Sequence, residues 1–159
     1  MANRIKKASY VSLQSALAHY GLIPENVPVI TSVTTGRPQT FSTPVGTFVY
    51  KHIQKSIFNG YLQVEVGTNQ MAFLAGPEKS LLDLIYLSPQ ADRREFLQEL
   101  RLQNLEELNL EALIRMAEAT GSSKLARAAR RVAGTGNSAH QWCASGHIGC
   151  AALCPLPRG

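Results

Sequence analysis

The side chains best suited to bind a metal ion are gathered near the end of the chain. Two histidines and three cysteines follow the spacing H-x2-C-x3-H-x2-C-x3-C, at His140, Cys143, His147, Cys150 and Cys154. Zinc favours such ligands, but the spacing lacks the paired C-x2-C motifs of common zinc modules. The stretch that leads into it, GTGNSAHQ, has the composition of a flexible linker. We therefore predict no metal site and no cofactor, and interpret residues 135–159 as a flexible or adventitious tail.

Catalytic residue types are sparse in residues 1–134. This part of the chain has no cysteine, and neither of its two histidines, His19 and His52, has a serine partner at a recognisable spacing. Neither of the glycine-rich motifs that cradle phosphates is present. A metal-dependent nuclease would need carboxylates near a lysine, which allows one set to be drawn: Glu65, Glu78, Lys79 and Asp83. The pattern as a whole favours a protein that is not an enzyme.

Asp83 has an unusual setting for a carboxylate. It stands inside the apolar run SLLDLIYL, so we expect it to be partly buried and to need polar partners. Lys79 precedes it by four residues, the spacing of an ion pair on one helix face. Glu78 suits the positive N-terminus of the same helix. We predict structural roles for all three side chains.

Basic residues point to a binding surface instead. The net charge is +5, and residues 122–159 contain five Lys and Arg but no acid. Lys124, Arg127 and Arg131 recur at i, i+3 and i+7, which places them on one helix face, with Arg130 beside them. Such a face could grip nucleic-acid phosphates or an acidic protein surface, or could simply be solvated near a helix C-terminus. A second basic group lies in the sheet region: Arg37, Lys51 and Lys55.

The elements that carry these residues fall into two halves. Ser12 is a suitable N-cap for a helix that ends before Gly21, and five extended segments follow, VPVITSVTT, QTFST, TFVYKHI, YLQVEV and MAFLA. Their short turns predict a mostly antiparallel sheet of about five strands. Four helical patterns follow, beginning at Pro77, Asp92, Leu110 and Ser122 or Ser123, and the last has the stripe Leu125, Ala128, Ala129 and Val132 and ends at Gly134. The sequence therefore predicts an α+β fold with one domain over residues 1–134.

Three segments between Tyr10 and Leu87 together resemble a known protein family. They read YVSLQSALAHYGLIP, VITSVTTGRPQTFSTPVGTFVYKHI and MAFLAGPEKSLLDLIYL. In this order they resemble the C-terminal domain of AbiEi-family antitoxins, which belong to abortive-infection toxin–antitoxin systems of bacterial phage defence. The resemblance covers about residues 10–133. It implies a domain that is not an enzyme and that opposes a nucleotidyltransferase-type toxin, directly or on a shared nucleic-acid target.

Family members also act as transcriptional regulators, through a winged helix-turn-helix domain that precedes this module. Only nine residues precede Tyr10 here, so we do not expect sequence-specific DNA binding. The sequence leaves two alternatives open: a protein that binds nucleic acids nonspecifically through its basic surfaces, and an orphan remnant of a mobile element. No apolar run is long enough to span a membrane, and no secretory signal is recognisable. We therefore expect a cytoplasmic protein with no membrane partner.

Overall fold

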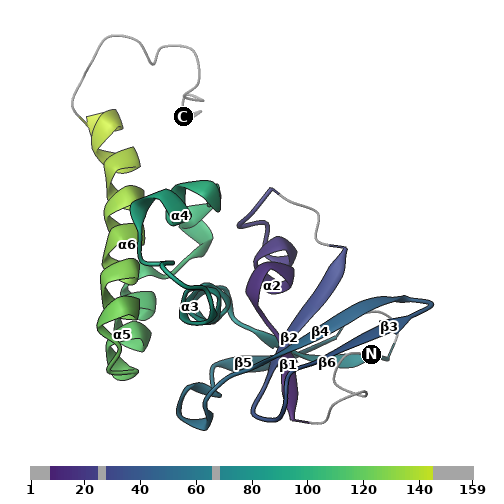
Figure 1. Ribbon diagram of the computed structural model, residues 1–159. Helices are drawn as coiled ribbons and strands as arrows, with labels where there is room; N and C mark the ends of the chain where they lie inside the picture. Colours follow the sequence, from purple (N-terminus) through teal and green to yellow (C-terminus); the bar gives the residue numbers. More distant parts are fainter. Residues whose placement is uncertain (1–7, 25–27, 66–68, 145–159) are drawn as a thin grey trace, which may run out of the picture.

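The described part of the chain combines one mixed sheet with a set of helices. The computed structural model describes residues 8–24, 28–65 and 69–144, with side chains up to residue 135. Within these ranges it contains six strands and five α-helices. The predicted α+β class is confirmed. Figure 1 shows the sheet on one side of the molecule and the last two helices on the other.

Six strands form the sheet in the order β3-β4-β2-β1-β6-β5. Their bounds are Ser9–Val11 for β1, Val29–Thr34 for β2, Gln39–Thr43 for β3, Gly46–His52 for β4, Tyr61–Glu65 for β5 and Met71–Ala75 for β6. β3 and β4 form the hairpin predicted at Pro44, with Thr43 opposite Gly46. β5 and β6 form a second antiparallel pair.

The predicted sheet of about five mostly antiparallel strands is confirmed in part. Three of the five strand pairings are antiparallel, but the structure differs from the prediction in two features. The structure adds β1, a strand of three residues that lies antiparallel to β2 and parallel to β6. It also pairs β2 with β4 in parallel, because β3 folds to the outer edge of the sheet and not between them. Short turns fix only the antiparallel hairpins, and both parallel pairings join strands that are distant in sequence.

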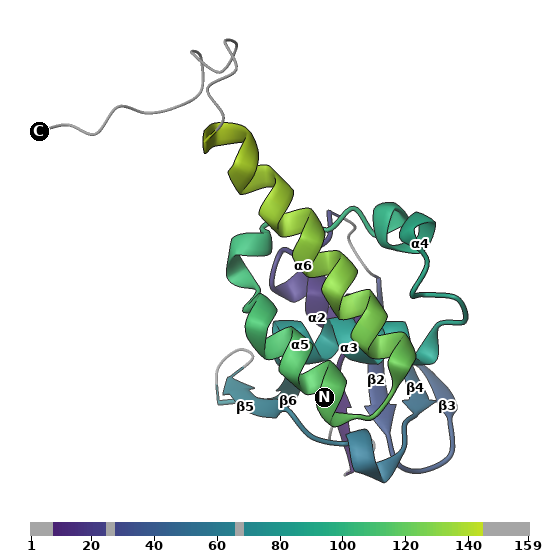
Figure 2. The ribbon, with the colours of Figure 1, turned by 90° about the vertical axis from the view of Figure 1, so that its left-hand side faces the viewer.

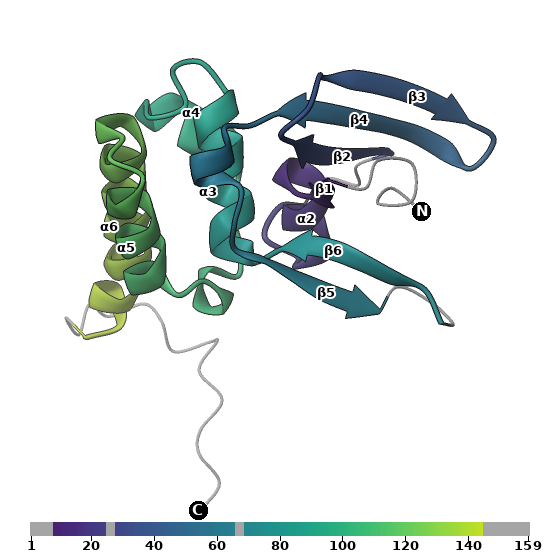
Figure 3. The ribbon, with the colours of Figure 1, turned by 90° about the horizontal axis from the view of Figure 1, so that it is seen from below.

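Helix α3, Pro77–Leu87, lies at the centre of the molecule. It contacts α2 (Leu13–His19), strand β6, α5 (Leu110–Ala119) and α6 (Ser123–Ala144). Figure 3 shows α3 between the sheet and the α5–α6 pair, and Figure 2 shows α6 crossing in front of it. Seven of its eleven residues are buried, including one lysine and one aspartate. The buried lysine and aspartate must therefore find their partners inside the protein.

Local signals in the sequence placed the ends of two helices correctly. α2 ends at a Schellman motif in which Gly21, at φ +68°, donates to the Ala18 carbonyl and Leu22 donates to the Leu17 carbonyl. Proline occupies the first turn of α3, as expected from its missing N–H.

The end of α6 differs from the prediction. All four residues of its apolar stripe are buried, and Val132 is the last buried residue whose side chain is described. The helix nevertheless continues past Gly134 to Ala144. Glycine lowers helix stability by only about 1 kcal/mol. No proline that could stop the helix occurs between Gly134 and Pro155. Loss of the apolar stripe marks the end of core packing, and it does not end the helix.

Candidate functional site

Four side chains form a buried polar cluster between β1 and α3: Tyr10, Ser12, Lys79 and Asp83. The Tyr10 hydroxyl donates to Oδ2 of Asp83 at 2.9 Å, and the Ser12 hydroxyl donates to the same oxygen at 2.7 Å. Lys79 Nζ donates to Oδ1 of Asp83 and forms an ion pair with it. The two hydroxyl contacts join residues more than seventy positions apart, so the cluster fastens β1 to the central helix.

Burial shapes the electrostatics of this buried polar cluster. Burial raises the pKa of Asp83 above its ordinary value, although the Lys79 charge and three hydrogen bonds act in the opposite direction. Burial and the neighbouring Asp83 carboxylate also raise the pKa of Tyr10, so its hydroxyl keeps its proton and donates. Lys79 Nζ lies 5.9 Å from the centre of the Tyr10 ring. The Lys79 charge and the hydrogen bonds thus offset part of the cost of burying the Asp83 carboxylate.

Aromatic rings pack against Tyr10 of the cluster. Tyr10 stacks on Tyr61 with their ring centres 4.9 Å apart, and Phe58 lies 5.0 Å from Tyr10. Phe73 meets Tyr61 edge to face. The Asp83 and Lys79 side chains are only 0% and 3% exposed. A substrate cannot reach this carboxylate in the described conformation, so the arrangement is suited to holding the fold and not to general acid–base chemistry.

A metal-dependent nuclease site built on Lys79 and Asp83 would also need the carboxylates of Glu65 and Glu78. The structure places these two carboxylates elsewhere. Glu65 Oε1 accepts from the Asn69 backbone in the β5–β6 turn. Glu78 Oε1 accepts from the Asn109 backbone at the start of α5, at 2.8 Å. The Glu65 oxygen is engaged in the β5–β6 turn and the Glu78 oxygen at the start of α5, so the four side chains do not form one metal-binding group. In the described ranges no three His, Cys, Asp or Glu side chains come close enough to hold a metal ion.

Of the five His and Cys residues near the C-terminus, only two lie among the described residues. His140 and Cys143 lie on the helical backbone of α6, beyond the last described side chain. His147, Cys150 and Cys154 lie outside the described residues.

The basic residues of α6 turn out to hold the helix in place. Lys124 donates to the Ser88 carbonyl, and Arg127 makes two hydrogen bonds to the Asp92 carboxylate, the shorter at 2.8 Å. Arg131 donates to the Asp92 carbonyl, and Arg130 pairs with Glu118 of α5. Residues 122–159 contain no acid, but the fold brings acids from other elements to this helix. Arg127 and Arg130 remain more than half exposed.

The second basic group is exposed and lies in a different layer. Lys51 is on β4, Lys55 begins the short 3-10 helix η1 (Lys55–Ile57), and Arg37 lies in the β2–β3 connection. β4 pairs with β2 and β3, whereas α6 packs on α5 and α3. The two basic groups therefore belong to separate layers of the fold.

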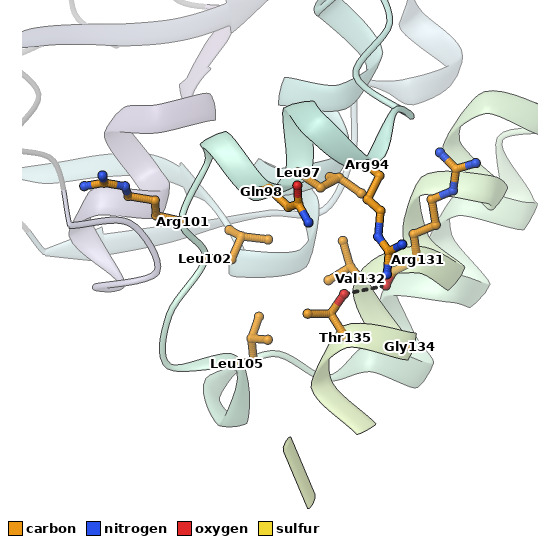
Figure 4. A pocket seen from close by; sticks show the side chains of 10 residues that line it. All are labelled: Arg94, Leu97, Gln98, Arg101, Leu102, Leu105, Arg131, Val132, Gly134 and Thr135. Atoms are coloured by element: carbon orange, nitrogen blue, oxygen red, sulfur yellow. Dashed lines mark hydrogen bonds between the residues drawn. The ribbon is translucent and has the colours of Figure 1, made fainter. Parts of the chain in front are cut away.

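A pocket that the sequence did not predict opens between α4 and α6. α4 spans Arg94–Glu99 and is followed by the 3-10 helix η2, Leu105–Glu107. The pocket has a volume of about 750 Å³ and ten lining residues: Arg94, Leu97, Gln98, Arg101, Leu102, Leu105, Arg131, Val132, Gly134 and Thr135. Figure 4 shows Arg94 extending from α4 toward α6, with Leu102, Leu105 and Val132 between the walls. We call this site the arginine pocket.

One signal could have indicated the arginine pocket. The segment DRREFLQELRL contains Arg94 and Arg101 seven residues apart, the distance of two helical turns. The predicted helix over residues 92–102 is shorter in the structure, and Arg101 has a left-handed backbone with φ +48°. The contribution of α6 to the opposite wall could not be read from the local sequence.

Comparisons with known proteins identify no family for this chain. No protein-family model matches it, and no curated protein or solved structure does so either. The resemblance to the AbiEi antitoxins thus stays a prediction. Among the described residues, no helix has both the length and the apolar composition needed to cross a membrane.

Proposed function

We propose that this chain is an antitoxin-like regulatory domain without enzymatic activity, which opposes a nucleotidyltransferase-type toxin in bacterial phage defence. The main support is the buried polar cluster. Tyr10 and Ser12 come from the first segment of the AbiEi resemblance, and Lys79 and Asp83 come from the last. Their side chains meet in the core. The residues that carry the resemblance are thus joined in one structural module, as a shared fold would require.

The distribution of polar groups favours a binding role over catalysis. The Asp83 carboxylate, whose pKa is raised by burial, has no exposed surface, and the hydrogen bonds to it all come from within the protein. By contrast, the arginine pocket is open and carries charged groups at its walls. A buried carboxylate has a structural role, whereas exposed arginines beside apolar side chains are suited to binding a partner.

Nonspecific nucleic-acid binding receives less support from the structure. Its best surface was the basic face of α6, but Lys124, Arg127 and Arg131 are engaged by the segment between α3 and α4. The basic residues around β4 form a separate, small group. A polyanion bound nonspecifically needs a continuous basic track.

Co-expression tests the proposal. The probe is the nucleotidyltransferase encoded beside this gene, expressed in a bacterial host with and without the full chain. We expect the toxin alone to stop growth and the chain to restore it, while an active-site variant of the toxin leaves growth unaffected. Growth that stays arrested with soluble chain present would contradict the proposal, as would the absence of any such neighbouring gene.

A further inference from the structure

The arginine pocket combines two kinds of side chain that a solvated surface does not need together. Its apolar part consists of Leu97, Leu102, Leu105 and Val132, and its charged part consists of three arginines. The lining contains no carboxylate. An occupant that matches both parts must offer apolar groups and separate negative charges.

Two of the three arginines are available for such an occupant. Arg131 donates to the Asp92 carbonyl. Within the described part of the chain, the side chains of Arg94 and Arg101 make no hydrogen bond or ion pair, and both residues are exposed. A guanidinium group presents a fixed set of donors that can bind a carboxylate through two parallel hydrogen bonds.

The wall that carries Arg101 is held in place from outside the pocket. Gln103 donates through its backbone to the Leu22 carbonyl at 2.9 Å. Asn104 donates through its side chain to the Gly21 carbonyl at 2.8 Å. These bonds fix the α4–η2 connection to the end of α2, so the pocket does not have to be ordered by its ligand. A preformed site loses less entropy on binding.

Charges around the pocket argue against a nucleic acid as the occupant. Exposed glutamates lie on α4 and η2, namely Glu95, Glu99, Glu106 and Glu107. They would repel a continuous phosphate backbone, whereas isolated carboxylates can be placed between them and beside the arginines. A phosphate backbone would also leave the leucines without apolar partners.

The walls of the pocket decide which peptide conformation fits. One wall is α6, and the other consists of the short helix α4, the connection after it and the 3-10 helix η2. They offer no strand edge for an extended peptide to pair with, so side chains must make the contacts. An amphipathic helix presents apolar side chains at i, i+3, i+4 and i+7 with charged ones at the margins of that face.

We propose that the arginine pocket binds an acidic amphipathic helix of a protein partner, with its apolar side chains on the leucines and its carboxylates on Arg94 and Arg101. The inference rests on the proposed function, because the partner would be the toxin or a protein of the same system. It deepens that function by stating which face of the chain and which partner chemistry form the contact.

A model peptide tests the site without the toxin. The probe is a short fluorescent helical peptide with leucines at i, i+3, i+4 and i+7 and flanking glutamates. We expect saturable binding to the full chain, and a dissociation constant at least about tenfold higher for the Arg94→Glu/Arg101→Glu double variant, a loss of about 1.4 kcal/mol. The matched control is Arg115→Glu, an exposed arginine on α5 outside the pocket, which should bind as the wild type does.

Several outcomes would overturn the inference. They are no saturable binding, equal binding by the double variant, equal binding of a probe with lysines in place of its glutamates, or displacement of the probe by short duplex DNA. Growth rescue separates this inference from the proposed function. If wild type and double variant neutralise the toxin equally well, the pocket inference fails and the antitoxin role stands. If the probe binds as expected but growth is never restored, the antitoxin role alone fails.

Discussion

The buried polar cluster and the arginine pocket use charged side chains in opposite ways. In the cluster, Lys79 and Asp83 are enclosed and every polar atom of the carboxylate is bonded from within. In the pocket, Arg94 and Arg101 are exposed beside a partly exposed apolar surface. A buried charge whose partners all lie within the fold needs no partner from outside. A charge left in solvent next to apolar side chains has free energy to gain only from a partner.

The largest effect should follow removal of the buried carboxylate. Asp83→Ala leaves the Lys79 ammonium and two hydroxyls unpaired in the core, which we expect to lower the free energy of unfolding by about 3–5 kcal/mol. Urea denaturation measures the free energy of unfolding of the variant and of the wild type. Asp92→Ala is the control, because it breaks the ion pair of a largely exposed Arg127 and should cost far less. Similar midpoints for the two variants would remove the distinction between the regions.

A smaller effect should come from Gly60, which packs against the cluster. Its φ is +72°, and a Cβ there would lie 3.2 Å from Lys79 Cγ and 3.1 Å from Met116 Cε. We expect Gly60→Ala to cost about 1–3 kcal/mol from backbone strain and crowding. Gly121→Ala measures the backbone strain alone, since Gly121 has φ +69° but no atom within 4 Å of its Cβ position. The difference between the two variants is therefore the cost of crowding. Equal losses in both variants would show that close packing at Lys79 contributes nothing.

The smallest effect should be a pair of pH dependences with opposite signs. Burial raises the pKa of Asp83, so its contribution to stability should be lost as the pH rises from its ordinary pKa, near 3.8, through the raised value. The hydrogen bond from Arg127 lowers the pKa of Asp92, so its contribution should be present above 3.8 and lost as the pH falls through the lowered value. Unfolding curves from about pH 3 to about pH 7 measure both slopes.

Wild type is compared with Asp83→Asn and with Asp92→Asn in that experiment. Relative to wild type, Asp83→Asn should be most destabilising at the acid end, and Asp92→Asn only at the neutral end. Slopes of the same sign for both variants would contradict the assignment of one carboxylate to the core and the other to the surface.

Local chemistry in the sequence predicted much of the fold. The α6 stripe, the Gly21 cap, the Pro44 hairpin and the proline at the start of α3 depend on residues close together in the chain, and all are present. What failed depends on distant contacts. β1 is too short to show a periodicity, and the parallel pairing of β2 with β4 requires β3 to move to the edge.

The candidate site divides in the same way. The spacing of Lys79 and Asp83 within an apolar run is enough to predict an internal ion pair, because both residues share one helix face. The hydrogen bonds from Tyr10 and Ser12 to Asp83 could not be predicted, because these residues meet Asp83 only after β1 has joined the sheet. Likewise, the charge count over residues 122–159 could not show that Asp92 and Glu118 would face α6.

The central claim is that the pocket side carries the function and the cluster carries the fold. The most direct test measures growth rescue and urea unfolding for one variant from each region, at matched amounts of folded protein. Ser12→Ala should lose about 1.5–3 kcal/mol, the worth of a hydrogen bond to a charged group, yet still restore growth. Arg94→Glu/Arg101→Glu should keep its stability and fail to restore growth. Loss of rescue in Ser12→Ala together with full rescue in the double variant would contradict the account.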